Sequence, residues 1–474
     1  MKNRKHLKAI PLYLLLLSVA LSCSRSMNPN IERGSTFKFR EGFPEVRVSA
    51  IGFLDEGDEP GIDVSADIVY GSLIYKEEQD SLQARFTIEI QILPKDDTRG
   101  TPTTHQETVT ITRANPDIVN SQNLFSYDKR IPVDPGSYDI NVTVIDRNSG
   151  KQLTRQTQTF IPDPNNSVQN LTNIQLLGKT MGDEEWAPIT TYDVQGDVDS
   201  LMFRLQVTNN TSEEPMAVNA RLLRFRSDTT IARPMYYNGY SPSSIQYKGI
   251  DYDEEEVIQS NRRVLTQPGS VLIEYKFGKQ PRGNYRFDVQ TDEEEENRLF
   301  KARDFGVKSK NYPSIKSARE LARPLNYLMS EKEYDEMMAI QDEDSLKQAV
   351  DRFWLKNLNN KNRARQVIQM YYQRVEEANK QFSNFKEGWK TDLGMIYILF
   401  GPPWYVDDSL NRMRWSYSYN RNDPDYNYLF ETPKLKSEFY PYQNYLLQRN
   451  QYYFNIEYQQ TQLWLTGQIL RRSL

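Results

Sequence analysis

The spacing of apolar residues changes near Ser314, and this change divides the chain into two kinds of structure. Before it, apolar and polar residues alternate, as in Phe86, Ile88 and Ile90, which is the period of half-buried β-strands. After it, apolar residues recur three or four positions apart, which is the period of amphipathic helices. We therefore expect a multidomain chain in which all-β units precede an α+β unit.

The β region divides again at a stretch rich in Pro and Asn, residues 162–166. Residues 44–165 and residues 168–310 are expected to form two tandem all-β sandwiches. In each of them a late strand opens on a Gly-x-Tyr sequence, which ends at Tyr138 in the first unit and at Tyr285 in the second. This arrangement resembles the tyrosine corner of immunoglobulin-like sandwiches, in which the hydroxyl bonds back to nearby backbone. The resemblance implies two immunoglobulin-like sandwiches.

The N-terminal 43 residues are not expected to be part of these units. Residues 1–22 place basic side chains before an apolar run of about 12 residues, the layout of a secretory signal and too short for a transmembrane helix. Cys23 follows directly and is the only cysteine of the chain. The sequence Ala-Leu-Ser-Cys that ends at Cys23 resembles a bacterial lipobox, which implies removal of the signal and diacylation of Cys23. Residues 23–43 are then an acylated tether.

The signal segment and the lipobox-like sequence predict that the protein lies in the cell envelope, bound to a membrane through its N-terminal lipid. Ser24, rather than an acidic residue, follows the cysteine, which resembles the sorting rule for lipoproteins that reach the outer membrane instead of the inner one. Without residues 1–22, acidic residues outnumber basic ones further, so nucleic acid is not an expected partner. We expect other envelope proteins as partners, with a glycan as the alternative.

The C-terminal unit, residues 314–474, is expected to begin with helices. Ser330 and Glu333 have the spacing of a capping box at a helix start. A longer apolar stripe runs from Ala364 to Phe382 at spacings of three and four residues, which predicts a long amphipathic helix.

A distinctive motif, Gly388-Trp389-Lys390-Thr391-Asp392, follows this long helix. The apolar run 393–400 comes next, ends in Gly401-Pro402-Pro403, and is followed by Arg414-Trp415-Ser416-Tyr417. Together these features resemble the GWxTD-domain proteins over roughly residues 320–474. The resemblance implies a buried strand over residues 393–400, an export signal and β-sandwich regions ahead of the domain, and it implies no particular reaction. A further strand is expected over residues 452–458.

Structural roles are expected for the motif residues. Gly388 and Gly401 lie where a helix ends and where the expected strand turns back, and glycine tolerates positive φ at such places. Pro402-Pro403 ends the strand. Thr391 and Asp392 are expected to bond to backbone groups of the connection as turn or cap residues. The alternative role for Asp392 is that of a carboxylate general base.

The side chains available for catalysis are few. His105 is the only histidine beyond the signal and lies far from the motif, and Cys23 is committed to lipid, so Ser-His-Asp, Cys-His and multi-histidine zinc sites are not expected. Phosphate-loop and dinucleotide motifs are also absent, and neither a cofactor nor a metal is expected. The remaining enzymatic hypothesis is a carboxylate-dependent hydrolase in which Asp392 acts with Asp407 or Asp408.

Binding is the competing hypothesis, because the C-terminal region is crowded with aromatic residues. Trp404, Tyr405, Trp415 and Tyr417 are the candidates closest to the motif. Exposed Tyr and Trp rings stack on sugars or anchor partner proteins, whereas the alternation of Tyr417 with serines indicates that some of these rings are core. We rank an envelope interaction or scaffold lipoprotein first, a carbohydrate- or peptidoglycan-binding envelope protein second, and the hydrolase third.

Overall fold

The structure is a computed structural model. It describes residues 32–33, 37–38, 42–54, 59–78, 80–95, 101–121, 123–211, 215–237, 249–292, 298–358, 360–409, 412–418, 426–432 and 444–471. The signal segment and Cys23 lie outside the described residues, so lipidation stays a prediction. Of the tether, the short strands β1 (Glu32–Arg33) and β2 (Phe37–Lys38) pair with each other. Within the described ranges, every helix is too short or too polar to cross a bilayer.

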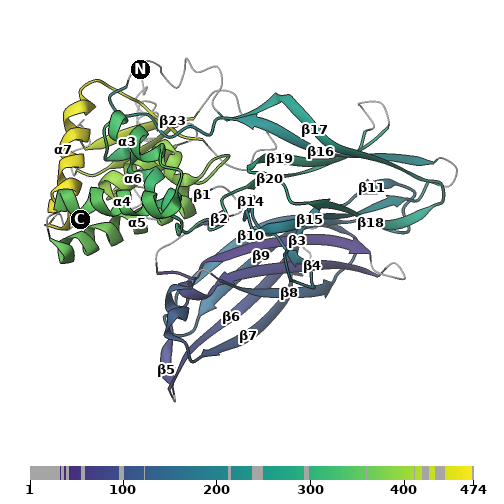
Figure 1. Cartoon of the computed structure of the whole chain (residues 1–474). Helices are drawn as coiled ribbons and strands as arrows, with labels where there is room; N and C mark the ends of the chain where they lie inside the picture. Colours follow the sequence, from purple (N-terminus) through teal and green to yellow (C-terminus); the bar gives the residue numbers. More distant parts are fainter. Residues whose placement is uncertain are drawn as a thin grey trace, which may run out of the picture.

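The first β unit consists of two antiparallel sheets that enclose one core (Figure 1). One sheet has the order β3 (Val46–Leu54), β4 (Pro60–Val69) and β8 (Leu124–Pro132). The other has the order β10 (Gln152–Ile161), β9 (Gly136–Asp146), β6 (Ser81–Pro94) and β5 (Lys76–Glu78), with β7 (Thr103–Arg113) also paired to β6. Two 3-10 turns, η1 (Tyr70–Ser72) and η2 (Pro116–Asn120), connect the sheets at one end.

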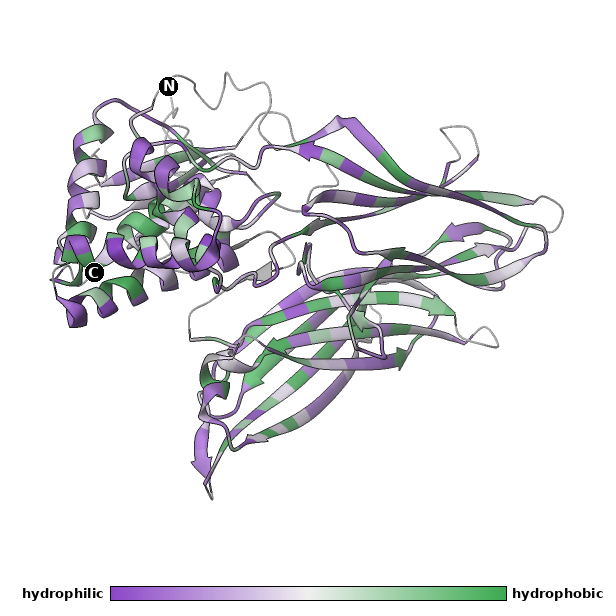
Figure 2. Cartoon of the chain, in the orientation of Figure 1, coloured by the Kyte–Doolittle hydropathy of each residue, from purple (hydrophilic) through white to green (hydrophobic). Residues whose placement is uncertain are grey.

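Alternation of apolar and polar residues explains why these strands form sheets with one buried face. Phe86, Ile88 and Ile90 of β6 are fully buried, as predicted from their period-two spacing. Val64 of β4 and Val142 of β9 belong to the same buried cluster. The alternation is visible as changing colour along the strands in Figure 2.

The second β unit repeats this sandwich-like arrangement with a separate core. Its first sheet has the order β11 (Gln169–Leu171), β15 (Val198–Asn209), β12 (Gln175–Thr180) and β13 (Ala187–Pro188), with β18 (Gly269–Gly278) on β15. Its second sheet has the order β14 (Asp193–Val194), β20 (Phe300–Val307), β19 (Gly283–Thr291), β16 (Met216–Ser227) and β17 (Ile250–Leu265). Phe203 and Phe287 stack at the centre of the core with ring centroids 4.3 Å apart.

Both β units contain the backbone contact that the Gly-x-Tyr sequences predicted. The Tyr138 hydroxyl donates to the Asp134 carbonyl oxygen at 2.7 Å, and the Tyr285 hydroxyl donates to the Pro281 carbonyl oxygen at 2.7 Å. In each case the acceptor lies four residues upstream, so the hydrogen bond closes the turn that precedes the strand of the tyrosine. We call this contact a tyrosine clamp.

The C-terminal unit gathers the helices around a third core, which lies against the second β unit (Figure 1). The helical segments are α2 (Ala318–Ala322), η3 (Arg323–Tyr327), α3 (Glu331–Met338), α4 (Glu343–Leu358), α5 (Lys361–Phe382), η4 (Gly388–Lys390), α6 (Asp392–Phe400), α7 (Tyr453–Leu465) and η5 (Gln468–Arg471). A small antiparallel sheet has the order β21 (Tyr405–Ser409), β22 (Arg412–Ser416), β23 (Asn427–Glu431) and β24 (Leu446–Leu447). The predicted capping box of Ser330 and Glu333 is confirmed at the start of α3.

Two segments expected to be strands are helices. Residues 393–400 form most of α6, whose nine residues are all buried, and residues 453–458 begin α7. Residues 393–400 are apolar throughout, so their sequence shows no periodic pattern that distinguishes a helix from a strand. The aromatic residues at the start of α7 favour a strand only weakly. The β-rich architecture with C-terminal helices is confirmed, whereas these two strand assignments were wrong.

Candidate functional site

Motif residues 388–391 complete the connection between α5 and α6, Asp392 begins α6, and close packing requires glycine in this region. A Cβ atom on Gly388 would lie 1.8 Å from the Ala378 carbonyl oxygen, and one on Gly394 would lie 1.9 Å from the Gly388 carbonyl oxygen. The predicted positive φ is found at Gly401, where φ is 85°, and not at Gly388. The chain therefore passes over itself where any side chain would collide with backbone.

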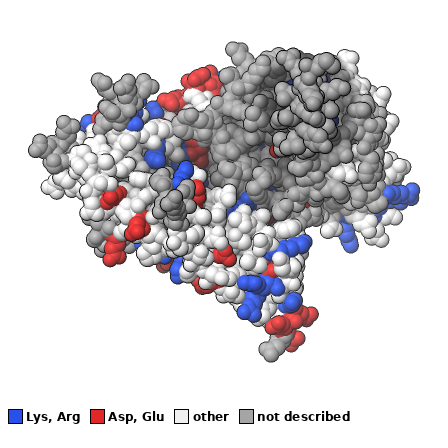
Figure 3. Space-filling view, turned by 180° about the vertical axis from the view of Figure 1, so that it is seen from behind, with Lys and Arg blue, Asp and Glu red and all other residues white. Residues whose placement is uncertain are grey.

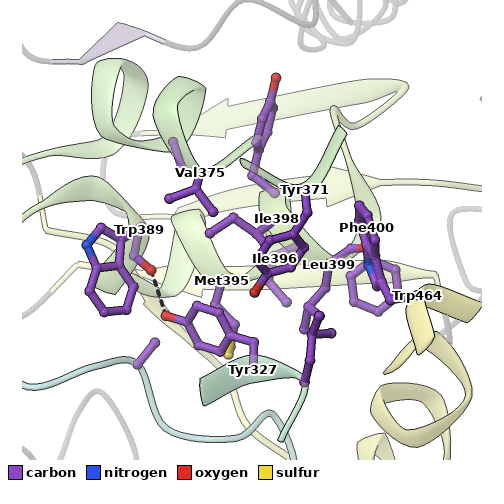
Figure 4. Packing of buried hydrophobic residues seen from close by; sticks show 14 of the residues in the cluster. Tyr327, Tyr371, Val375, Trp389, Met395, Ile396, Ile398, Leu399, Phe400 and Trp464 are labelled. Atoms are coloured by element: carbon purple, nitrogen blue, oxygen red, sulfur yellow. Dashed lines mark hydrogen bonds between the residues drawn. The ribbon is translucent and has the colours of Figure 1, made fainter. Parts of the chain in front are cut away.

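Trp389 is buried in this connection, with 6% of its surface exposed. The Tyr327 hydroxyl donates to the Trp389 carbonyl oxygen at 2.6 Å, and the two rings meet edge to face with centroids 6.4 Å apart (Figure 4). The Trp389 amide donates to the Asn379 side chain at 3.2 Å. Trp389 thus ties η3 and α5 to the motif through its ring and through both of its backbone polar groups.

Thr391 caps the helix that follows, as predicted. Its hydroxyl oxygen accepts from the Gly394 amide at 3.0 Å and donates to the Gly388 carbonyl oxygen at 2.7 Å. The two bonds satisfy a free amide at the start of α6 and close the turn before it.

Asp392 does not play the local role expected of it. The Arg449 guanidinium donates to both of its carboxylate oxygens, at 2.7 and 2.8 Å, and the Leu447 amide donates to one of them at 2.7 Å. The side chain of Asp392 is 6% exposed and that of Arg449 is 0% exposed. Burial alone would raise the pKa of Asp392, but Arg449 and the Leu447 amide outweigh it and hold the pKa below its usual value. The carboxylate is a charged partner for a residue 57 positions away, and not a turn or cap residue.

Arg449 extends this contact to the second β unit. It binds the segment of residues 228–237, here called the strap, which follows β16. Arg449 donates to the carbonyl oxygens of Pro234 at 3.1 Å and of Arg233 at 2.9 Å. Ala232 and Met235 of the strap are buried in the core of the C-terminal unit. The motif carboxylate therefore positions the guanidinium that holds the strap.

Glu457 of α7 is a second acidic residue at the strap, and it is half-buried. One of its carboxylate oxygens accepts from the Met235 amide at 2.8 Å. Burial raises the pKa of Glu457 to about 7, although the Met235 amide and then Arg449 act in the opposite direction. The folded protein therefore binds a proton at Glu457 more tightly than the unfolded chain does.

This shift predicts that stability falls as pH rises from about 4.5 to about 7, the window between the ordinary and the folded pKa of Glu457. Glu457→Gln keeps an oxygen acceptor for the Met235 amide but has no proton to lose. We expect the free energy of unfolding of this variant to exceed that of the wild type at pH 8. At pH 4.5 most of this difference between the two proteins should be gone. Denaturant titrations at both pH values measure it. An equal difference at the two pH values would contradict the assignment.

Charged side chains form a second contact between the motif and the second β unit. Glu387 pairs with Arg282, which precedes β19, and with Lys390 at 2.8 Å. Burial and then the Arg282 guanidinium lower the pKa of Lys390, while the Asp228 carboxylate acts in the opposite direction. Lys386 donates to the carbonyl oxygen of Thr230 in the strap at 2.8 Å. The positive and negative groups compensate one another where the two units meet.

The aromatic residues proposed for binding are divided between core and partly exposed positions. Trp415 is fully buried and Tyr417 nearly so, with the Tyr417 hydroxyl donating to the Gly401 carbonyl oxygen at 2.7 Å. This burial rules out both rings as ligand-stacking surfaces. Trp404 and Tyr405 are half-buried, and Pro402 and Pro403 follow α6 as the turn before β21.

Three of the groups considered for catalysis, Asp392, Asp408 and His105, contact other side chains of the protein. Asp392 is engaged by Arg449, whereas Asp407 and Asp408 lie on β21, where Asp408 accepts from the Tyr445 hydroxyl at 3.3 Å. His105 is in the first β unit, with its Nε2 atom 3.1 Å from the Tyr127 hydroxyl oxygen. Within the described part of the chain, no three His, Cys, Asp or Glu side chains gather in a way that could hold a metal ion.

Sequence reasoning missed Arg449, Glu457 and the strap. Arg449 follows a polar, aromatic stretch with no periodic pattern, and nothing local connects it to Asp392. The strap lies in the connection between two strands of the second β unit, where a polar loop was the ordinary expectation. A partner that is distant in sequence leaves no signal in a single chain.

Comparison with known families supports the motif resemblance. Residues 283–466 match the model of the GWxTD domain. The match begins at the start of β19, ahead of the boundary near residue 320 expected from the motifs, so it includes two strands of the second β unit and their contacts with the C-terminal unit. No curated protein sequence matches the chain.

Three solved structures resemble part of the chain at low sequence identity. The red sea bream transglutaminase is 7% identical, with 56% of this chain and 31% of that chain covered and a TM-score of 0.18. A Salmonella alpha-2-macroglobulin mutant is 14% identical, with 58% and 17% covered and a TM-score of 0.20. The trypsin-activated alpha-2-macroglobulin of Escherichia coli is 11% identical, with 56% and 17% covered and a TM-score of 0.17. The chain spans less than a third of each of these proteins.

Proposed function

We propose that this chain is a membrane-anchored lipoprotein of the cell envelope that serves as an interaction or scaffold module and not as an enzyme. The observation that carries the proposal is the state of Asp392, the only carboxylate of the motif. Both of its oxygens are bound by Arg449, and one also accepts from the Leu447 amide. A general base needs a lone pair within reach of its substrate, and a carboxylate occupied in this way stabilises the fold instead.

The close connection between the three units further supports a scaffold. The Gln206 side chain donates to the Leu54 carbonyl oxygen at 2.9 Å and accepts from the Leu54 amide at 2.8 Å, which joins the two β units. Thr190 donates to the Asp67 carboxylate at 2.9 Å across the same boundary. The strap and the charged contacts at Glu387 join the second β unit to the C-terminal unit. Such buried polar contacts favour a rigid body, which suits a protein that holds partners in a fixed arrangement.

We assign both β units to the immunoglobulin-like class on the basis of their tyrosine clamps and their facing antiparallel sheets. In this arrangement they act as spacers between the membrane and the C-terminal unit. The lipid on Cys23 provides the attachment, and Ser24 favours the outer membrane. On the face shown in Figure 3, the described Lys and Arg side chains include a group at the lower right that lies directly above a group of Asp and Glu side chains.

The test is to crosslink the full chain in its own envelope and to identify its N-terminus and partners by mass spectrometry. We expect an acylated Cys23 and reproducible crosslinks to envelope proteins, and we expect a Cys23→Ser variant to leave the membrane fraction. Wild-type protein with an unmodified thiol in the soluble fraction would refute the anchor. Crosslinks to glycan alone, with no protein partner, would refute the scaffold.

A further inference from the structure

A hollow of about 730 Å³ lies beside α7 in the C-terminal unit. It is lined mainly by α7, with contributions from the end of α6, the residue before β23, and η5. Its volume falls within the range of about 300–1,000 Å³ that is typical of small-molecule sites. Neither the motif nor the strap contributes a residue to it, so the packing of the motif does not explain the hollow.

An exposed tyrosine ring marks the hollow. Tyr458 lines it and is 59% exposed, the highest exposure of any aromatic ring in the described part of the chain. Tyr452 also lines it and is 38% exposed. A tyrosine ring offers an apolar face together with a polar hydroxyl, which matches the apolar CH faces and hydroxyl groups of a sugar.

Uncharged amide side chains supply the polar part of the lining. Asn455, Gln459, Gln462 and Gln468 all line the hollow. Each amide both donates and accepts hydrogen bonds, as a sugar hydroxyl also does. Asn455, Gln459 and Gln468 are exposed, and no side-chain hydrogen bond to another protein group occupies them within the described residues.

The scarcity of charge on α7 is a separate observation that indicates the type of ligand. Glu457 is the only acidic or basic residue among its 13, and it binds the Met235 amide of the strap. By contrast, α5 carries seven charged residues among its 22. A helix on a protein surface usually presents several charged groups to water, so a helix whose polar residues are mostly amides and tyrosines is unusual. Of the residues that line the hollow, only Arg471 is a cation, and a guanidinium can donate to sugar hydroxyl oxygens.

We propose that this hollow binds a short neutral oligosaccharide. Tyr458 stacks on the face of one sugar ring, and Asn455 and Gln459 exchange hydrogen bonds with its hydroxyl groups. The proposal does not depend on the scaffold function, because the hollow and the junction at the strap share no lining residue.

Binding of defined sugars to the full chain in detergent tests this site. The probes are cellotetraose, maltotetraose and N-acetyl-chitotetraose, measured by isothermal titration calorimetry. We expect at least one of them to bind, and Tyr458→Ala to weaken that binding about tenfold, which corresponds to about 1.4 kcal/mol. Tyr458→Phe keeps the ring and should bind within about threefold of the wild type, a difference below 1.4 kcal/mol.

Phe454→Ala is the matched control. Phe454 is an exposed ring on the same helix, but it packs against Tyr236 and does not line the hollow, so its removal should leave sugar binding unchanged. Thermal melting of each variant shows that the fold is kept. Failure of all three sugars to bind the wild type, or equal binding by Tyr458→Ala, would overturn the proposal. Preferential binding of heparin, an anionic polysaccharide, would overturn the assignment to neutral sugars.

Discussion

Asp392→Asn is expected to lower the free energy of unfolding by about 3–5 kcal/mol, the usual cost of removing one partner from a buried ion pair. The amide has nearly the shape of the carboxylate, but it leaves the guanidinium of Arg449 buried without its counter-charge. An amide nitrogen would also face a donor of Arg449 or the Leu447 amide. Denaturant titrations followed by circular dichroism measure the loss. Hydrogen exchange should increase in the strap, because Arg449 also holds that segment.

A control substitution and a double-mutant cycle test whether the loss of stability comes from the Asp392–Arg449 pair. Asp335→Asn changes an exposed aspartate of α3 and should alter stability by no more than about 0.5 kcal/mol. In a double-mutant cycle, Asp392→Asn combined with Arg449→Met should cost less than the sum of the single substitutions, because neither buried charge is then left alone. Additive costs would contradict the pairing. A stabilised Asp392→Asn protein that loses a cellular function would instead support a catalytic carboxylate.

Trp389→Ala is expected to lower the free energy of unfolding by about 3–5 kcal/mol, the typical cost of emptying a large aromatic site in a core. The ring fills the space between the motif and Tyr327, and the connection around it is packed too tightly to collapse into the gap. Thermal and denaturant unfolding measure the change.

Tyr327→Phe is the companion variant, since it keeps the ring contact and removes only the hydrogen bond to the Trp389 carbonyl oxygen. It should lower the free energy of unfolding by about 1 kcal/mol, the net value of one such hydrogen bond. The loss rises to about 3 kcal/mol if the Trp389 carbonyl oxygen is left buried and unpaired. If Trp389→Ala were no more harmful than Tyr327→Phe, the ring would not be the anchor of the connection.

Features set by neighbouring residues could be predicted from the sequence. The period-two pattern of β6 lies within one strand, and the capping box of Ser330 and Glu333 and the cap made by Thr391 depend on contacts within a few residues. The clamps of Tyr138 and Tyr285 are equally local, because each hydroxyl reaches back only four residues. For these elements, pattern and turn chemistry are the physical cause of the structure.

Other features depend on which distant segments come together. Residues 393–400 are apolar throughout, so only the surrounding core decides that they form helix α6 and not a strand. Asp392 was expected to be a turn or cap residue, or alternatively a general base, but its partner lies 57 residues away in a stretch with no regular pattern. The sequence by itself determined the sandwich-like β units, the helical C-terminal region and the motif, because these follow from local patterns. Apolar burial and charge pairing, by contrast, act through space between residues that are distant in the sequence. The tertiary structure alone decided that the motif carboxylate, through Arg449, holds the strap of the second β unit.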